Sequence, residues 1–228
     1  MKAIRYFKLF YFIADHWNSK LALFTIYHEI KGERKYLINS SEIDDLHAQE
    51  IQSPNLKHAS IYQPTNYYLI EKAFDYLRSE NENHSILDFG CGKGRVMIVA
   101  AFYGFKNITG VDFVPSFCEE ASWNIEKVQS QFPATTFNVF CEDATQFKIE
   151  NDQSVFFFFN PFDEKIMLAV VKNILASLKI KQRRIIVVYI NPLHKEIFLS
   201  AGFYEEYFFR KMKYLEFSIL VKEEDNDY

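Results

Sequence analysis

The sequence has few cysteines, and their positions form no recognisable framework. Cys91, Cys118 and Cys141 are the only three in 228 residues, and their spacing fits neither a zinc knuckle nor a set of disulfides. We therefore expect no metal site and a reducing, cytoplasmic setting. An excess of positive charge is also absent, since the formal net charge is −4. That balance provides no general attraction for polyanions and argues against duplex DNA as a partner.

Long apolar runs are absent as well. Residues 3–17 are rich in apolar side chains, but Arg5, Lys8 and Asp15 interrupt them. The uninterrupted run at residues 9–14 is too short to cross a bilayer, which takes about 20 apolar residues in a helix. We expect neither a signal segment nor a transmembrane segment here.

The same N-terminal residues have the spacing of an amphipathic helix. Its polar stripe comprises Arg5, Lys8, Asp15 and Ser19. Its apolar stripe comprises Phe7, Phe10, Ala14 and Trp17. We expect this helix to pack on the rest of the protein, with a membrane-surface or partner-binding helix as the alternative.

Two short apolar segments follow, with a glycine between them. Residues 21–30 and 35–38 flank the sequence Lys-Gly-Glu-Arg at 31–34, a pattern typical of two strands joined by a turn. We therefore expect a small β-ribbon arm. Composition indicates a globular chain of one domain with an appendage, so we assign residues 1–61 to an N-terminal extension and residues 62–228 to the main domain.

A short apolar strand that breaks into three alternating glycines occupies residues 85–95, Ser-Ile-Leu-Asp-Phe-Gly-Cys-Gly-Lys-Gly-Arg. A helical pattern follows directly. Gly90, Gly92 and Gly94 permit the backbone angles of a tight turn and let the main chain approach a ligand. A strand, a glycine loop and a helix N-terminus together form a nucleotide site.

Spacing separates three kinds of glycine loop. The phosphate loop of NTPases needs Ser or Thr after Gly-Lys, whereas Lys93 is followed by Gly94 and Arg95, so that loop is excluded. The dinucleotide fingerprint places its third glycine one position later than Gly94. The pattern Asp88-x-Gly-x-Gly-x-Gly instead resembles motif I of the class I S-adenosylmethionine (SAM)-dependent methyltransferases. A glycine turn in another doubly wound protein is the alternative.

The rest of the chain alternates strand and helix patterns as a parallel sheet requires. Six further strands are expected at residues 107–113, 137–141, 155–159, 184–190, 203–209 and 214–221. The resemblance implies a Rossmann-like, doubly wound α/β fold with a seven-stranded sheet and an antiparallel last strand. The N-terminal helix and β-arm extend it.

The resemblance also implies SAM as the cofactor and assigns residues to its binding. The glycine loop and Asp88 orient the methionyl group. A carboxylate such as Asp112 at a strand end can accept hydrogen bonds from both ribose hydroxyls, although it could also cap the next helix. The expected SAM-binding residues are Tyr62, Asp88, Gly90, Cys91, Gly92, Gly94, Asp112, Phe113, Asp143, Ala144 and Asn160.

Three of these assignments rest on short patterns. Asp143, which we favour over Glu142, and Ala144 resemble the family's adenine-reading turn, with a solvated turn as the alternative. Tyr62, in Tyr-x-Pro before a helix, resembles a segment that closes over SAM in several methyltransferases, or it is a packing residue. Phe113 corresponds to the apolar residue that packs on the adenine.

A strand at residues 155–159 delivers Asn160-Pro161-Phe162 to the carboxyl edge of the sheet. This resembles the Asn-Pro-Pro-aromatic motif of methyltransferases that modify planar amino nitrogens, in which the Asn oxygen and the next carbonyl accept hydrogen bonds from the target amine. Only one proline is present, so Phe162 stands one position earlier than the family's aromatic residue. The resemblance makes Asn160, Pro161 and Phe162 the expected catalytic residues. A plain loop start, with Asp163 as a helix cap, is the alternative.

These patterns predict a SAM-dependent methyltransferase, with the resemblance covering about residues 62–221. The acceptor atom is expected to be a nitrogen of a protein, an RNA nucleobase or a small molecule, and no metal is required. The alternative is a SAM-binding module without turnover that docks a partner through its N-terminal helix. The sequence identifies neither the acceptor nor the oligomeric state.

Overall fold

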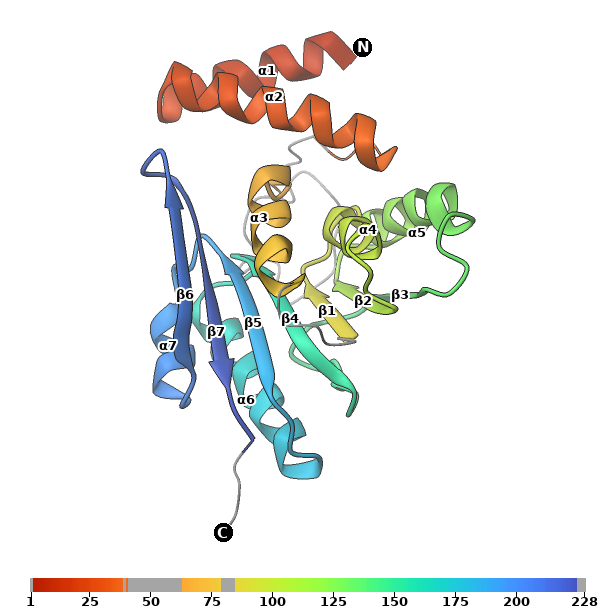
Figure 1. Cartoon of the computed structure of the whole chain (residues 1–228), viewed down its shortest axis with the longest axis vertical. Helices are drawn as coiled ribbons and strands as arrows, with labels where there is room; N and C mark the ends of the chain where they lie inside the picture. Colours follow the sequence, from red (N-terminus) through yellow and green to blue (C-terminus); the bar gives the residue numbers. More distant parts are fainter. Residues whose placement is uncertain (1, 39, 41–62, 79–84, 225–228) are drawn as a thin grey trace.

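The computed structural model describes residues 2–38, 40, 63–78 and 85–224, and these residues form one seven-stranded sheet covered by helices (Figure 1). The strands are β1 Ser85–Phe89, β2 Asn107–Asp112, β3 Thr136–Cys141, β4 Gln153–Phe159, β5 Ile185–Ile190, β6 Tyr204–Lys211 and β7 Leu215–Lys222. Their order across the sheet is β3-β2-β1-β4-β5-β7-β6, and β7 runs antiparallel to both of its neighbours. The predicted doubly wound sheet with an antiparallel last strand is confirmed.

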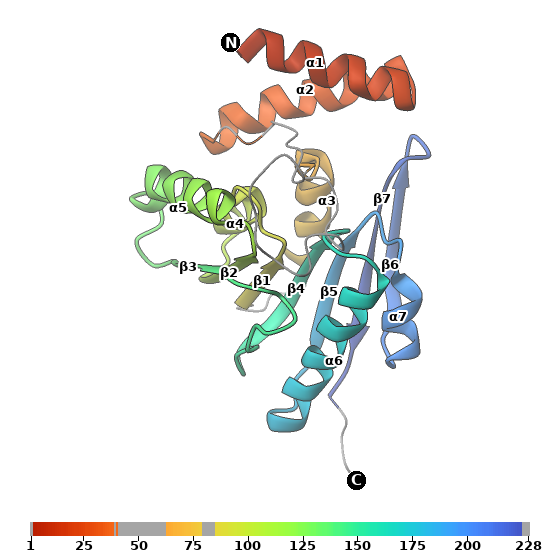
Figure 2. The ribbon, with the colours of Figure 1, turned by 180° about the vertical axis from the view of Figure 1, so that it is seen from behind.

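Helices cover both faces of this sheet (Figure 2). On one face lie α3 Tyr67–Arg78, α4 Arg95–Phe102 and α5 Pro115–Gln129, and on the other lie α6 Glu164–Ile180 and α7 Lys195–Ser200. Alternate residues of β4 pack on opposite faces of the sheet. Phe157 packs on the face covered by α3 and α4, and Phe156 and Phe158 pack on the face covered by α6 and α7. A strand buried on both faces reads as a continuous apolar run, as residues 155–159 do.

The N-terminal residues form a pair of helices, α1 Lys2–His16 and α2 Ser19–Tyr36, which lies across the top of the molecule in Figure 1. The expected β-ribbon arm is therefore wrong. Asn18 caps α2, since its side-chain oxygen accepts a hydrogen bond of 2.8 Å from the backbone N–H of Leu21. Buried residues then recur at helical rather than alternating spacing.

Gly32, which suggested a turn, lies inside α2. Its role is to allow close packing, because a Cβ at this position would come within 2.3 Å of the ring of Tyr67 in α3. Glycine in a helix interior costs about 0.5–1 kcal/mol relative to alanine. The contact with Tyr67, which is distant in the sequence, explains why the local pattern gave the wrong element.

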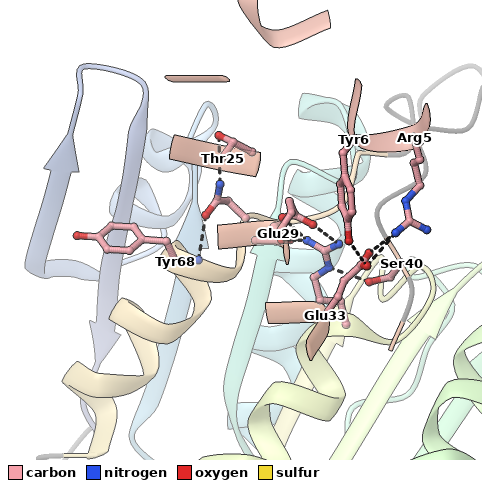
Figure 3. Close-up of polar contacts among 10 residues, drawn as sticks. Arg5, Tyr6, Thr25, Glu29, Glu33, Ser40 and Tyr68 are labelled. Carbon is pink, nitrogen blue, oxygen red and sulfur yellow. Dashed lines mark hydrogen bonds and ion pairs between the residues drawn. The ribbon is translucent and has the colours of Figure 1, made fainter. Parts of the chain in front are cut away.

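Helix α1 is present as predicted, but a different face of it is buried. Leu9 and Ile13 are buried, whereas Phe7 is 61% exposed and Trp17 is also exposed. Arg5, assigned to the polar stripe, turns inward and donates hydrogen bonds of 2.8 Å to both carboxylate oxygens of Glu33 in α2 (Figure 3). A buried partner of opposite charge makes an inward arginine acceptable.

Membrane-spanning helices and clusters of metal-binding side chains are both absent from the described residues. None of their helices is long and apolar enough to cross a membrane. Nor do these residues include a group of three or more His, Cys, Asp or Glu side chains placed to hold a metal ion.

Candidate cofactor-binding site

The loop between β1 and α4 turns through three residues in the left-handed region. Gly90, Gly92 and Gly94 have φ angles of 75°, 50° and 78°, which residues with side chains adopt rarely. The backbone N–H of Gly90 donates a 2.8 Å hydrogen bond to the carbonyl of Val111 in β2. A Cβ on Gly90 would lie 2.5 Å from the Cβ of Pro161. Glycine is therefore required where this loop meets the loop after β4.

Asp112 lies at the end of β2 and is buried against the glycine loop. Its two carboxylate oxygens accept hydrogen bonds from the backbone N–H groups of Gly92, at 2.9 Å, and Val114, at 3.0 Å. Burial raises the pKa of Asp112 to about 6, although these backbone N–H groups act in the opposite direction. Each oxygen keeps a second lone pair that can accept a hydrogen bond from a ligand.

The carboxyl group of Asp88, in β1, is buried near that of Asp112, with the residue 3% exposed. Burial, and secondly the negative charge of Asp112, raises the pKa of Asp88 well above its ordinary value. Among the described residues, no side chain forms a hydrogen bond or ion pair with the carboxyl group of Asp88. Two buried carboxyl groups this close together create a site that favours a cation.

A cavity of about 90 Å³ lies at the carboxyl edge of the sheet, where β1 is flanked by β2 and β4. This is the point at which the strand order reverses, and ligands bind there in open α/β sheets. Its lining includes most of the predicted site residues, namely Asp88, Gly90, Cys91, Asp112, Phe113, Ala144, Asn160, Pro161 and Phe162. The fold thus brings residues from the ends of four strands, β1, β2, β3 and β4, to one place.

Four predicted residues are not in that lining. Gly92 and Gly94 shape the loop instead. Asp143 is engaged elsewhere, because its carboxylate accepts hydrogen bonds from the backbone N–H and the hydroxyl of Thr145, at 2.8 and 2.7 Å. Glu142 lines the cavity in its place. Tyr62 falls outside the described residues.

Asn160 follows β4 and lines the cavity with an unusual backbone conformation. Its φ of 40° is left-handed, which asparagine tolerates better than most residues. Its side-chain oxygen is buried and has no hydrogen-bond partner among the described residues. An unsatisfied buried acceptor costs about 1–3 kcal/mol. Such an oxygen beside a cavity is suited to an N–H or O–H donor of a ligand.

The sequence did not predict the wall that closes the cavity on the N-terminal side. Gln63, Pro64 and Thr65 form part of it, together with Arg95 at the start of α4. The Tyr-x-Pro pattern drew attention to this segment, but to Tyr62 rather than to the residues that line the cavity.

Arg95 connects the glycine loop to the N-terminal helices. Its guanidinium donates two hydrogen bonds of 2.8 Å to the carboxylate of Glu29 in α2, one of 2.7 Å to the carbonyl of Thr65 and one of 2.9 Å to the hydroxyl of Ser40. It also lies 4.1 Å above the ring centre of Tyr67. Figure 3 shows Glu29 and Ser40 in this cluster. No sequence pattern links Arg95 to Glu29, because 66 positions separate them.

Part of the chain matches a known family and a curated relative. Residues 86–181 match the family described as Methyltransferase domain. Ribosomal protein L11 methyltransferase from Bacillus pumilus (strain SAFR-032) is 29% identical over 105 residues, which are 44% of this chain and 33% of that protein. The match thus spans about a third of the length of that relative.

Solved structures of low sequence identity share the fold. Magnesium protoporphyrin IX methyltransferase from Synechocystis PCC 6803, with bound SAM, is 16% identical with a TM-score of 0.52, over 68% of this chain and 78% of that one. The Pyrococcus abyssi tRNA (uracil-54, C5)-methyltransferase, in complex with S-adenosyl-L-homocysteine, is 17% identical with a TM-score of 0.50, over 71% of this chain and 40% of that one. At these identities the likeness concerns the fold alone.

Proposed function

We propose that this chain, whose residues 86–181 form a methyltransferase domain of the class I fold, is a SAM-dependent enzyme that methylates a nitrogen. The observation that carries the cofactor proposal is the pair of buried carboxyl groups, Asp88 and Asp112, at adjacent strand ends. SAM supplies an electrophilic methyl group on a positively charged sulfur, beside an ammonium group. Burial, and secondly the charge of Asp112, raises the pKa of Asp88, and a cationic ligand at this edge favours the ionised carboxylate.

The chain's own residues divide the binding of SAM between them. In this proposal Asp112 accepts hydrogen bonds from the ribose hydroxyls with its remaining lone pairs. Phe113 and Ala144 line the adenine end, and Gly90 and Asp88 lie at the methionyl end. Glu142 takes the place at the adenine turn for which the sequence favoured Asp143, since Glu142 lines the cavity.

The cavity must widen to hold the whole cofactor. Its 90 Å³ is below the range of about 300–1,000 Å³ that is usual for small-molecule sites. The loop after β1 is held to β2, because Gly90 donates to the Val111 carbonyl and Gly92 donates to the Asp112 carboxylate. We expect the wall at residues 63–65 to move instead, because a single hydrogen bond from Arg95 to the Thr65 carbonyl holds it to α4.

Asn160 carries the proposal for a nitrogen acceptor. Its buried oxygen has no partner in the described residues and can accept an N–H bond from an incoming amine, holding the nitrogen lone pair toward the methyl group. Pro161 packs against Gly90 and fixes the direction of the chain after Asn160. Positioning of this kind supplies much of the rate enhancement in a transfer reaction. An amide also keeps the same protonation state throughout. This use of Asn160 favours turnover over binding alone.

We also propose that the enzyme works in the reducing cytoplasm. All three cysteines are free, and Cys91 and Cys118 are buried. Neither carries a role in the proposed transfer.

Calorimetric titration tests the cofactor, and transfer of tritium tests the reaction. SAM and S-adenosylhomocysteine should bind, whereas NAD and ATP should not. Protein, RNA and small-molecule fractions should then be incubated separately with tritiated SAM. The fraction that becomes labelled contains the acceptor. Binding of NAD without binding of SAM would contradict the proposal.

A further inference from the structure

A second cavity, of about 310 Å³, lies between the N-terminal helix pair and the carboxyl edge of the sheet. We call it the cap cavity. Leu9 and Ile13 of α1 and Leu21 of α2 line it from the helix pair, and Phe159 and Leu215 line it from the sheet. Its volume falls within the range of small-molecule sites, and its lining combines apolar side chains with polar and charged ones, among them Glu29, Lys213 and Glu216.

The cap cavity adjoins the proposed cofactor site. Gln63, Pro64 and Phe159 line both cavities, so these three residues form a shared wall. Asn160 comes directly after Phe159 and lines the cofactor side. A molecule in the cap cavity therefore lies one wall away from the place where Asn160 would hold a nitrogen.

Two neighbouring strands end in the same way beside the two cavities. Asn160-Pro161 follows β4 and Asn191-Pro192 follows β5, and the strands pair so that Phe159 is opposite Ile190. Both asparagines are left-handed, with φ of 40° and 49°. Asn160 lines the cofactor cavity and Asn191 lines the cap cavity. Adjacent amide side chains can thus contact two polar groups on one ligand.

We propose that the cap cavity binds the methyl acceptor, and that this acceptor is a small molecule with a flat apolar body and an amine. The proposal rests on the proposed function. The apolar body would pack among Leu9, Ile13 and Leu21, the amine would reach Asn160 past the shared wall, and Asn191 would bind a second polar group.

The position of the helix pair favours a small molecule over a polymer. α2 is held to the main domain by the buried Arg95–Glu29 pair, whose side chains are 3% and 2% exposed. A folded protein or an RNA that displaced α2 to reach Asn160 from this side would break that pair. Removing a partner from a buried ion pair is strongly unfavourable.

The transfer step balances without any further reactant. The amine nitrogen must be neutral, and its lone pair forms the N–CH₃ bond as the S–CH₃ bond pair returns to sulfur. The methylated nitrogen then loses a proton to water. Because Glu29 and Glu216 also line the cavity and a nearby carboxylate favours the ammonium form, the amine must release a proton to water before the attack.

Trp17 provides a reporter for binding, because it lines the cap cavity while the other tryptophan, Trp123, lies on α5 and is 62% exposed. In a Trp123→Phe protein, fluorescence would be titrated with 4-nitrobenzylamine, a flat apolar amine that quenches tryptophan. We expect saturable quenching. The double variant Ile13→Phe/Leu21→Phe fills the cavity and should weaken this binding at least tenfold.

A matched control makes the same substitutions on the outer side of the same helices. Ile4→Phe/Leu23→Phe alters residues that are 63% and 64% exposed, and it should leave quenching unchanged. SAM affinity by calorimetry should stay within twofold in both double variants, which shows that each is folded. The proposal would be overturned if Ile13→Phe/Leu21→Phe and Ile4→Phe/Leu23→Phe showed equal quenching, or if quenching never saturated.

Tritium transfer distinguishes failure of this inference from failure of the proposed function. The inference is supported if label from SAM appears in the small-molecule fraction and if the Ile13→Phe/Leu21→Phe variant transfers less of it. Label only in protein or RNA overturns it and leaves the methyltransferase proposal intact. If SAM does not bind to the wild-type protein, the proposed function fails, whatever the quenching shows.

Discussion

The cofactor edge of the sheet and the N-terminal helix pair are built by different kinds of contact. At the edge, the turn itself is made by the neighbouring residues Gly90, Gly92 and Gly94, although Asp112 and Pro161 reach it from distant positions. In the helix pair, the decisive contacts join distant residues, such as Arg5 with Glu33 and Arg95 with Glu29. Local contacts leave a readable sequence pattern, whereas distant ones do not. Five experiments test this comparison.

The largest effect should come from removing the distant contact that joins the two regions. Arg95→Met leaves the Glu29 carboxylate buried without its partner, so the free energy of unfolding should fall by about 3–5 kcal/mol. Urea denaturation measures it. The double variant Arg95→Met/Glu29→Met, which buries no charge, should recover a large part of the loss. A loss below about 1 kcal/mol in the single variant would show that the pair does not hold the helices in place.

At the cofactor edge, Asn160→Ala should affect turnover more than binding. SAM affinity should change by less than about 0.5 kcal/mol, because the residue faces the acceptor. Turnover should fall by a factor on the order of a hundred, the usual cost of losing a positioning group. Single-turnover kinetics with tritiated SAM separate the two quantities. Collapse of SAM binding would instead make Asn160 part of the cofactor site, and unchanged turnover would place the acceptor elsewhere.

Asp112→Ala should weaken SAM binding by about 1–3 kcal/mol, through loss of charge-assisted hydrogen bonds. Calorimetry on the folded variant measures this, and Asp143→Ala serves as the control because Asp143 bonds to Thr145 instead of lining the cavity. The control should bind SAM as the wild type does. The reverse ranking would restore Asp143 to the adenine site.

The raised pKa of Asp112, about 6, predicts opposite pH effects on stability and on binding. Its folded pKa lies above the unfolded value, so this group stabilises the free protein most at low pH, and that contribution is lost as pH rises through about 6. SAM, as a cation, should bind the ionised form, and its affinity should fall about tenfold between pH 7 and pH 5. Asp112→Asn should flatten both profiles. An affinity independent of pH in the wild type would contradict this account.

The smallest effect should come from removing a local contact in the helix pair, the capping hydrogen bond of Asn18. Asn18→Ala removes the cap of α2, so the free energy of unfolding should fall by about 1 kcal/mol. Thermal denaturation measures it, and Ser19→Ala, one residue later, is a control without that capping bond. A loss as large as that of Arg95→Met would mean that local contacts dominate here too.

The contrast explains what the sequence could predict. The strands of the sheet and the glycine loop were predicted correctly from residues 85–95 and the alternation that follows, because each signal lies within a few positions. Residues 86–181 also match the methyltransferase domain family that the loop resembles. Residues 21–30 and 35–38 were wrongly predicted as strands joined by a turn at 31–34, since Gly32 meets Tyr67 only after folding. The inward turn of Arg5 depends likewise on Glu33. Glu142 rather than Asp143 lines the cavity because the nearby Thr145 binds Asp143, a competition that spacing alone does not reveal.

The position of Arg95 has a consequence for how the two proposed binding sites affect each other. Its guanidinium holds Glu29 of the helix pair and Thr65 of the shared side of the cofactor cavity at once. If SAM moves residues 63–65, it must also alter the contact that holds α2 over the cap cavity. Thermodynamic reciprocity then applies. If bound SAM changes the affinity for the acceptor by some factor, bound acceptor changes the affinity for SAM by the same factor. If both proposed sites bind their ligands, this one buried arginine couples them.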